Sequence, residues 1–181
     1  MKILAGEFRG RNIKTPLQIR PVSLRIKKSC FDILAEEVRQ KRVLDLFSGS
    51  GSLGLEALSR GAVSASFVDF DKKCINVIKK NVSMLGLEQK SRVYPKDAFS
   101  AIKDFSVYKE IFDIVFIDPP YYQGIARNAL QHLKDYDILA PLGYIVAFCY
   151  QKDDFIQGGR LFSLIVDRKY GQNRVLIYKK L

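Results

Sequence analysis

The sequence predicts an α/β fold with a mostly parallel, seven-stranded sheet. From Val43 onward, short apolar segments alternate with amphipathic stretches, as in strands that helices cover on both faces. Near the end, two strand-like segments flank Gly171, Gln172 and Asn173, which predicts a closing antiparallel hairpin. A chain of 181 residues is long enough for one such domain and a short appendage.

The order of elements follows from the apolar periodicity. Five parallel strands are expected at residues 43–47, 64–70, 92–95, 112–118 and 143–150, with helices at 52–60, 71–85, 98–105 and 126–136. The closing hairpin is expected at 161–170 and 174–180. Before the first strand we expect a small hairpin within 2–14, turning near 9–12, and a helix at 24–38. We therefore divide the chain into a basic extension, 1–41, and an α/β domain, 42–181.

Charge separates the two ends of the chain from its middle. The net charge is +11, and residues 1–28 carry +7, residues 160–181 carry +5 and the residues between carry −1. Such basic ends favour a polyanionic partner, and nucleic acid is the leading one, although a solvated surface that aids solubility is the alternative. The basic residues expected to contact RNA phosphates are Arg9, Arg11, Lys14, Arg20 and Arg25.

Several other classes are disfavoured by composition. No apolar run approaches the roughly 20 residues of a membrane-spanning helix, and the N-terminus lacks the apolar core of a secretory signal. Cys30, Cys74 and Cys149 form no metal-binding set with His132, the single histidine, so we expect reduced thiols and no metal. The expected location is the cytoplasm, with no membrane partner.

A glycine loop follows the first predicted strand. Gly49, Gly51 and Gly54 form G-x-G-x-x-G between strand and helix, and Asp69 ends the next strand 20 residues after the first glycine. The glycines allow a ligand to approach the backbone, and the acid can accept ribose hydroxyls, which indicates a cofactor that contains adenosine. Nicotinamide nucleotides and S-adenosylmethionine both meet this description. Asp45 favours S-adenosylmethionine, because a carboxylate there would repel a pyrophosphate.

A rigid turn follows the fourth predicted strand. Asp118, Pro119, Pro120 and Tyr121 present a carboxylate, a carbonyl without a strand partner and an aromatic face. This set suits a planar base with an exocyclic amine: two oxygens accept the amine hydrogens and the tyrosine stacks on the ring. The nitrogen lone pair is then directed at a sulfonium methyl group, so catalysis is by positioning and electrostatics.

Residues 45–62 and 112–122 together resemble the Rossmann-like class I amino-methyltransferases. Residues 6–16, 20–34 and 170–180 extend this resemblance to the bacterial 16S rRNA guanine-N2 methyltransferases of the RsmD type. The resemblance implies a monomer that methylates one guanine amine of 16S rRNA, within the small subunit or an assembly intermediate. It implies S-adenosylmethionine as donor and S-adenosylhomocysteine as product.

The resemblance also assigns roles to individual residues. Phe47, Gly49 and Gly51 would line the methionine end of the cofactor, Asp69 its ribose, and Phe70, Asp97 and Ala98 its adenine. Asp118, Pro119 and Tyr121 would hold the target base. The chain departs from the family pattern at Val22 and Leu24, where family members tend to have threonine and aspartate.

Three alternative functions stay open on the sequence. An adenine-N6 methyltransferase shares the Asp-Pro-Pro-Tyr chemistry, although the chain leaves no segment for a domain that reads duplex DNA. A non-catalytic RNA-binding assembly factor would not bind S-adenosylmethionine. A nicotinamide-dependent dehydrogenase is more remote, because the chain offers no proton-relay residues and no second domain for a substrate.

Overall fold

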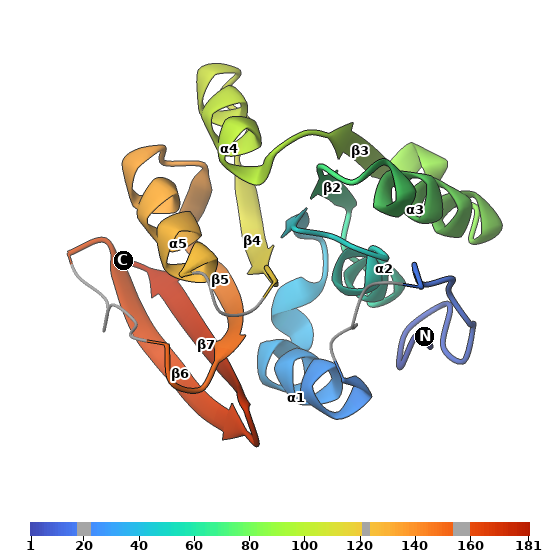
Figure 1. Ribbon diagram of the computed structural model, residues 1–181, viewed down its shortest axis with the longest axis horizontal. Coiled ribbons are helices and arrows are strands. Elements are labelled where there is room, and N and C mark those ends of the chain that lie inside the picture. The colour runs from blue at the N-terminus through green and yellow to red at the C-terminus, as the bar shows by residue number, and fades with distance from the viewer. Residues whose placement is uncertain (18–22, 121–123, 154–159) are drawn as a thin grey trace.

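A computed structural model describes residues 1–17, 23–120, 124–153 and 160–181 (Figure 1). The strands are β1 (Arg42–Leu46), β2 (Ser64–Asp69), β3 (Ser91–Pro95), β4 (Phe112–Ile117), β5 (Leu139–Tyr150), β6 (Phe162–Tyr170) and β7 (Asn173–Lys180). The α-helices are α1 (Leu24–Leu34), α2 (Ser52–Ser59), α3 (Lys72–Met84), α4 (Ala98–Val107) and α5 (Ile125–Asp135). Short 3₁₀ turns cover Ala35–Val38 and Glu88–Lys90.

The seven strands form one sheet in the order β3-β2-β1-β4-β5-β7-β6. Strands β1 to β5 are parallel to one another, and β7 pairs antiparallel with both β5 and β6. The predicted fold, including its closing hairpin, is therefore confirmed. The chain leaves β1 toward β2 on one side and returns to β4 on the other, so the carboxyl ends of β1 and β4 form the switch point where α/β sheets bind ligands.

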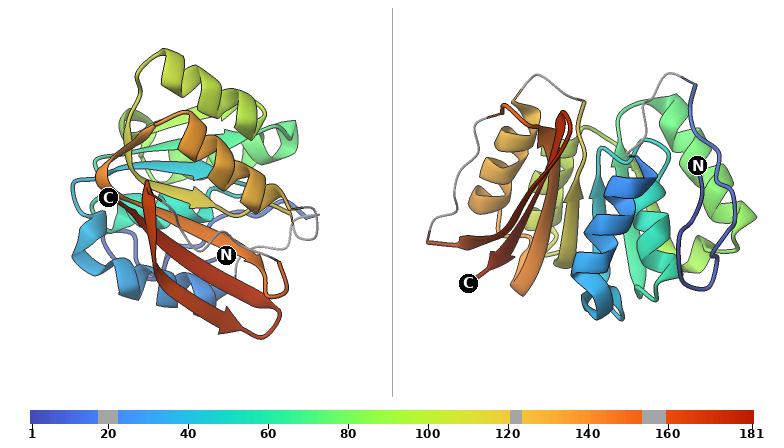
Figure 2. Two further views of the ribbon diagram at one scale, coloured as in Figure 1. Left: turned by 90° about the vertical axis from the view of Figure 1, so that its left-hand side faces the viewer. Right: turned by 90° about the horizontal axis from the view of Figure 1, so that it is seen from below.

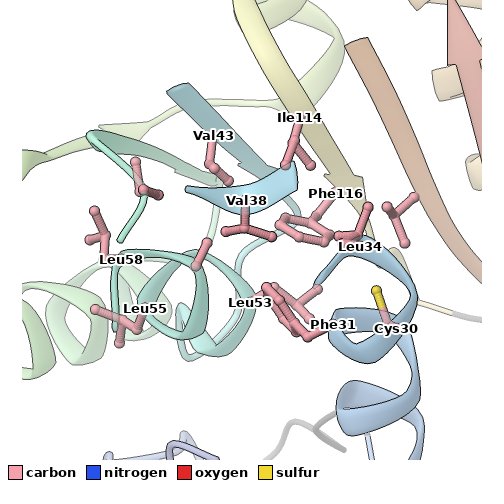
Figure 3. Packing of buried hydrophobic residues seen from close by; sticks show 14 of the residues in the cluster. Cys30, Phe31, Leu34, Val38, Val43, Leu53, Leu55, Leu58, Ile114 and Phe116 are labelled. Atoms are coloured by element: carbon pink, nitrogen blue, oxygen red, sulfur yellow. The ribbon is translucent and has the colours of Figure 1, made fainter. Parts of the chain in front are cut away.

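Two apolar layers hold the helices against the sheet. On one face α1, α2 and α3 share a core in which Phe31 and Phe116 lie with ring centroids 5.4 Å apart (Figure 3). On the other face α4 and α5 pack over a second core that includes Ile102 and Leu133. Both residues are nearly inaccessible to water, so each layer supplies the hydrophobic free energy that positions its helices.

The N-terminal hairpin packs along the outside of α2 as part of the first layer. Ile3 and Ile13 are buried in the core of that layer. At the far end of α2 the Glu7 N–H donates to the Ser59 carbonyl (2.8 Å). At Gly6, which has a φ of 80°, a Cβ atom would lie 1.7 Å from the same carbonyl oxygen, so the close approach requires glycine. The turn of this hairpin therefore lies at the opposite end of α2 from the glycine loop (Figure 2, right).

Some element boundaries differ from those expected. The predicted helix at 24–38 ends at Leu34, because Ala35 has a φ of 42° and interrupts the α-helical backbone before the 3₁₀ turn. β5 begins at Leu139, four residues before the expected position, and its pairing with β4 is irregular between Phe112 and Ile114. The N-terminal hairpin has a single bridge, between Lys2 and Asn12, and it turns earlier than expected.

Candidate cofactor and substrate site

The glycine loop connects β1 to α2, and three of its residues have positive φ angles, which few residue types other than glycine adopt easily. Phe47, Gly49 and Gly51 have φ values of 59°, 56° and 76°. Ser48 fastens the loop to β2: its N–H donates to the Val68 carbonyl (2.9 Å), and its hydroxyl oxygen accepts from the Val68 N–H (2.9 Å). The loop is thus preorganised for a ligand that approaches the N-terminus of α2.

Asp69 lies at the end of β2, beside the glycine loop. One carboxylate oxygen accepts from the Gly49 N–H (2.8 Å) and the other from the Asp71 N–H (2.9 Å). Burial raises the pKa of Asp69, and these backbone hydrogen bonds oppose the rise. Each oxygen keeps a second lone pair, so the carboxylate can both order the loop and accept a hydroxyl.

The expected adenine contacts lie at the same edge of the sheet. Phe70 follows Asp69 and is 73% exposed, which leaves its ring available for a flat ligand. Asp97 caps α4 by accepting from the Ser100 N–H (2.9 Å). Ala98 is buried, so only the first two of these three residues present a side chain to the surface.

Asp45 is a third carboxyl group at this edge, at the end of β1. It is fully buried and accepts from the Gly54 N–H (2.9 Å). Its pKa is raised well above the usual range, first by burial and then by the nearby charges of Asp118 and Asp69. Asp118 and Asp69 disfavour the ionised form of Asp45, and a bound cation would offset this repulsion, so the three carboxyl groups on adjacent strands favour a cationic ligand.

Asp118 follows β4 at the switch point. Burial raises its pKa to about 7, and none of the described residues donates a hydrogen bond to its carboxylate. Pro119 is buried and Pro120 is exposed, while Tyr121 lies outside the described residues. Asp118 is half-buried, and a carboxylate that is partly removed from water without a hydrogen-bond donor costs free energy unless a ligand supplies the donor, which makes Asp118 the strongest candidate for a substrate contact.

The expected RNA contacts lie in two places. Lys14 and Arg25 are exposed near the carboxyl edge of the sheet, whereas Arg9 and Arg11 lie around the turn of the N-terminal hairpin. Arg20 lies outside the described residues.

Sequence reasoning missed a buried polar link between the N-terminal hairpin and the glycine loop. Asn81 of α3 is fully buried, and its Oδ1 accepts from the Lys14 N–H (2.8 Å). Its Nδ2 donates to the Lys14 carbonyl (2.9 Å) and to the Ser50 carbonyl (3.0 Å). One amide therefore fixes a hairpin residue and a glycine-loop residue relative to each other.

A second buried link joins α1, α2 and the hairpin. The Lys27 ammonium lies 3.0 Å from the Glu56 carboxylate, and both side chains are fully buried. It also donates to the Ser52 hydroxyl (3.2 Å) and the Lys2 carbonyl (2.9 Å). Glu56 also accepts from the Leu4 N–H (2.9 Å). The N-terminal hairpin therefore forms a hydrogen bond with each partner of the ion pair, which offsets part of the cost of burying the two charges. Lys27 is therefore not available to a polyanion.

Within the described ranges, no group of three or more histidine, cysteine, aspartate or glutamate side chains could hold a metal ion. No described helix is long and apolar enough to cross a membrane. The sheet order, the glycine loop and the acidic edge together define a Rossmann-like methyltransferase fold.

Comparisons with known proteins identify the family. The profile of the family described as conserved hypothetical protein 95 matches residues 1–179. The Bacillus subtilis protein YlbH is 35% identical over 184 residues, which cover 99% of each chain. Ribosomal RNA small subunit methyltransferase D of Escherichia coli is 33% identical over 142 residues, 77% of this chain and 70% of that protein. The solved structure of Escherichia coli yhhF, 29% identical, covers 99% of this chain and 97% of its own with a TM-score of 0.87. The chain belongs to this family, whose curated members include ribosomal RNA small subunit methyltransferase D.

Proposed function

We propose that the protein transfers a methyl group from S-adenosylmethionine to the exocyclic N2 amine of a guanine in 16S rRNA. The observation that carries this proposal is the position of Asp118, a half-buried carboxylate to which no described residue donates a hydrogen bond, directly after β4 at the switch point of the sheet and close to Asp45. Membership of a family that includes ribosomal RNA small subunit methyltransferase D supports the choice of substrate.

Different residues at this edge bind different parts of the cofactor. Asp69 accepts ribose hydroxyls, and the exposed ring of Phe70 borders the adenine. The glycine loop places backbone against the methionine end, and the acidic edge formed by Asp45, Asp69 and Asp118 favours its positive charge. When bound, S-adenosylmethionine supplies an electrophilic methyl group on a sulfonium centre.

Asp118 and Pro119 orient the target amine. The carboxylate accepts one amine hydrogen and the Pro119 carbonyl accepts the other, which directs the nitrogen lone pair at the methyl carbon. The N–C bond forms as the C–S bond breaks, and the bonding pair stays on sulfur. The surplus proton of the nitrogen passes to Asp118 or to water.

The test is incubation with labelled S-adenosylmethionine and, in parallel, unmodified small subunits, free 16S rRNA and duplex DNA, followed by mapping of the labelled nucleotide. Label on a guanine N2 of the RNA is expected. Label in DNA alone would support adenine-N6 methylation, which the same Asp118 chemistry permits. Failure to bind the donor would support a non-catalytic RNA-binding role.

Two alanine variants test the role of Asp118. Asp118→Ala removes the side-chain oxygens that accept an amine hydrogen, so it should lose methyl transfer and keep donor binding. Asp113→Ala, at the other end of β4, removes a carboxylate that accepts from the Arg42 backbone N–H and guanidinium, and it should keep both. Full activity of Asp118→Ala would refute the role.

A further inference from the structure

The N-terminal segment and the β6–β7 turn both reach the carboxyl edge of the sheet, where Asp118 lies. β7 pairs antiparallel with β5, with Asn173 opposite Tyr150, so the β6–β7 turn lies beside the end of β5 (Figure 2, right). The Gln151 N–H donates to the Gln172 carbonyl (2.8 Å), which fixes the turn there.

The strand register places the β6–β7 turn relative to the target-base site. Ile117 pairs with Ala147, so Asp118 is level with Phe148. Phe148 pairs with Val175, and Val175 pairs with Arg168. Arg168 is therefore level with Asp118 and three strand spacings away, roughly 15 Å at about 4.8 Å each. Lys169 is one residue nearer the turn.

The N-terminal part of the chain adjoins the same edge. The Ser29 and Tyr170 hydroxyls share a hydrogen bond, which joins α1 to the end of β6. Lys27 contacts Ser52, so the first turn of α1, with Arg25, lies beside the start of α2. Lys14 lies on the other side, held through Asn81.

The structure separates the basic residues of the two ends into paired and available groups. Lys27 is buried, and Lys28, Arg174 and Lys180 form salt bridges with Asp32, Asp167 and Asp137. Lys14, Arg25, Arg168 and Lys169 are exposed, and none of these four has a salt bridge to any residue the structure describes. Exposed cations without a salt bridge to a described residue also lie elsewhere on the two ends, at Lys2, Arg9, Arg11 and Arg160, so the four residues near the site are one group among the available cations.

We propose that Arg168 and Lys169, at the end of β6 next to the β6–β7 turn, form together with Arg25 and Lys14 the surface that holds RNA phosphates on either side of the target base. This inference rests on the proposed function, because it takes RNA as the substrate. In this proposal the C-terminal hairpin binds the substrate directly. Its cations hold the RNA backbone so that one base can enter the site beside Asp118.

Arg9 and Arg11 provide a matched comparison. They lie around the turn of the N-terminal hairpin, and the eight residues of α2 separate that turn from the glycine loop by roughly 12 Å. Neutralising either pair lowers the net charge by two, so a difference between the pairs reports position and not total charge.

The experiment measures binding of a labelled 16S rRNA transcript from 0.1 to 1 M salt, for the full chain and three double variants. These are, in order, Arg168→Gln/Lys169→Gln, Arg9→Gln/Arg11→Gln and Lys14→Gln/Arg25→Gln. Loss of two phosphate contacts should reduce the slope of log K against log salt by about 1.4 and weaken binding about 25-fold at 0.1 M salt. We expect this loss for the first variant and a smaller one for the second. Lys14→Gln/Arg25→Gln should resemble the first, because Lys14 contacts Asn81 only through its backbone.

Donor affinity and thermal unfolding, measured on every variant, show whether each one is folded. Equal losses in the first two variants, or a larger loss at Arg9 and Arg11, would overturn the inference, as would an unchanged salt slope at Arg168 and Lys169. These outcomes differ from failure of the proposed function, which is an unmodified RNA after incubation of the wild-type protein with donor.

Discussion

Replacing Asn81 with alanine tests whether the N-terminal hairpin stabilises the glycine loop. The substitution removes three hydrogen bonds of a fully buried side chain, to the Lys14 N–H, the Lys14 carbonyl and the Ser50 carbonyl. At about 1 kcal/mol for each bond, the free energy of unfolding should fall by about 3 kcal/mol. For a chain of this size the melting temperature should fall by roughly 6–12 °C.

The same change should weaken donor binding, because the Ser50 carbonyl lies between two loop glycines that can then reorient. Loss of about 1 kcal/mol of loop ordering corresponds to roughly fivefold weaker affinity. Urea unfolding and donor calorimetry measure the two effects. Asn76→Ala, on the exposed side of the same helix, is the control. If Asn81→Ala behaves like Asn76→Ala in both assays, the hairpin does not support the loop.

Two further predictions concern the half-buried Asp118 and the buried Lys27. Because burial raises the pKa of Asp118 to about 7 and the carboxylate accepts the amine hydrogens, kcat/KM should rise with pH around 7, and a profile without this rise would contradict the assigned protonation state. The folded state also binds this proton more tightly than the unfolded state, so the stability due to Asp118 is present below pH 3.8 and is lost as pH rises to about 7; urea unfolding of wild type and Asp118→Asn across that window should show the difference. Lys27→Met should lower the free energy of unfolding by roughly 1–3 kcal/mol, since buried Glu56 loses the Lys27 ammonium and keeps its salt bridge to Arg60 (2.9 Å). Lys28→Met, which breaks an exposed pair, should change it by less than about 1 kcal/mol in the same denaturant titration, and similar losses in the two variants would refute the argument.

The sheet and the positions of Asp45, Asp69 and Asp118 could be predicted because each depends on local pattern. A continuous apolar strand that ends in an acidic residue places that residue at the carboxyl edge, whatever the rest of the chain does. The glycine loop could also be predicted from local pattern, since the spacing of its glycines fixes where the backbone turns.

The buried polar links could not be predicted in this way. Lysine and asparagine are usually exposed, so the sequence gives no reason to expect Lys27 and Asn81 in the interior. Their burial depends on partners 25 to 67 positions away in the chain. A weak signal exists at Glu56, a charged residue within the apolar helix 53–58, where a solvent-exposed side chain would not be expected. The charge count of the first 28 residues therefore overstated the cations available to RNA.

The long-range hydrogen bonds of the N-terminal hairpin also constrain the order in which the chain can fold. Residues 1–14 are synthesised before Glu56, Ser59 and Asn81, which anchor them. Pairing across 51 to 67 positions requires closure of a long loop, so docking of the hairpin belongs to the slow, late part of folding. Nascent chains in which Asn81 has not yet been synthesised should therefore leave this segment without its anchors and open to chaperones and proteases.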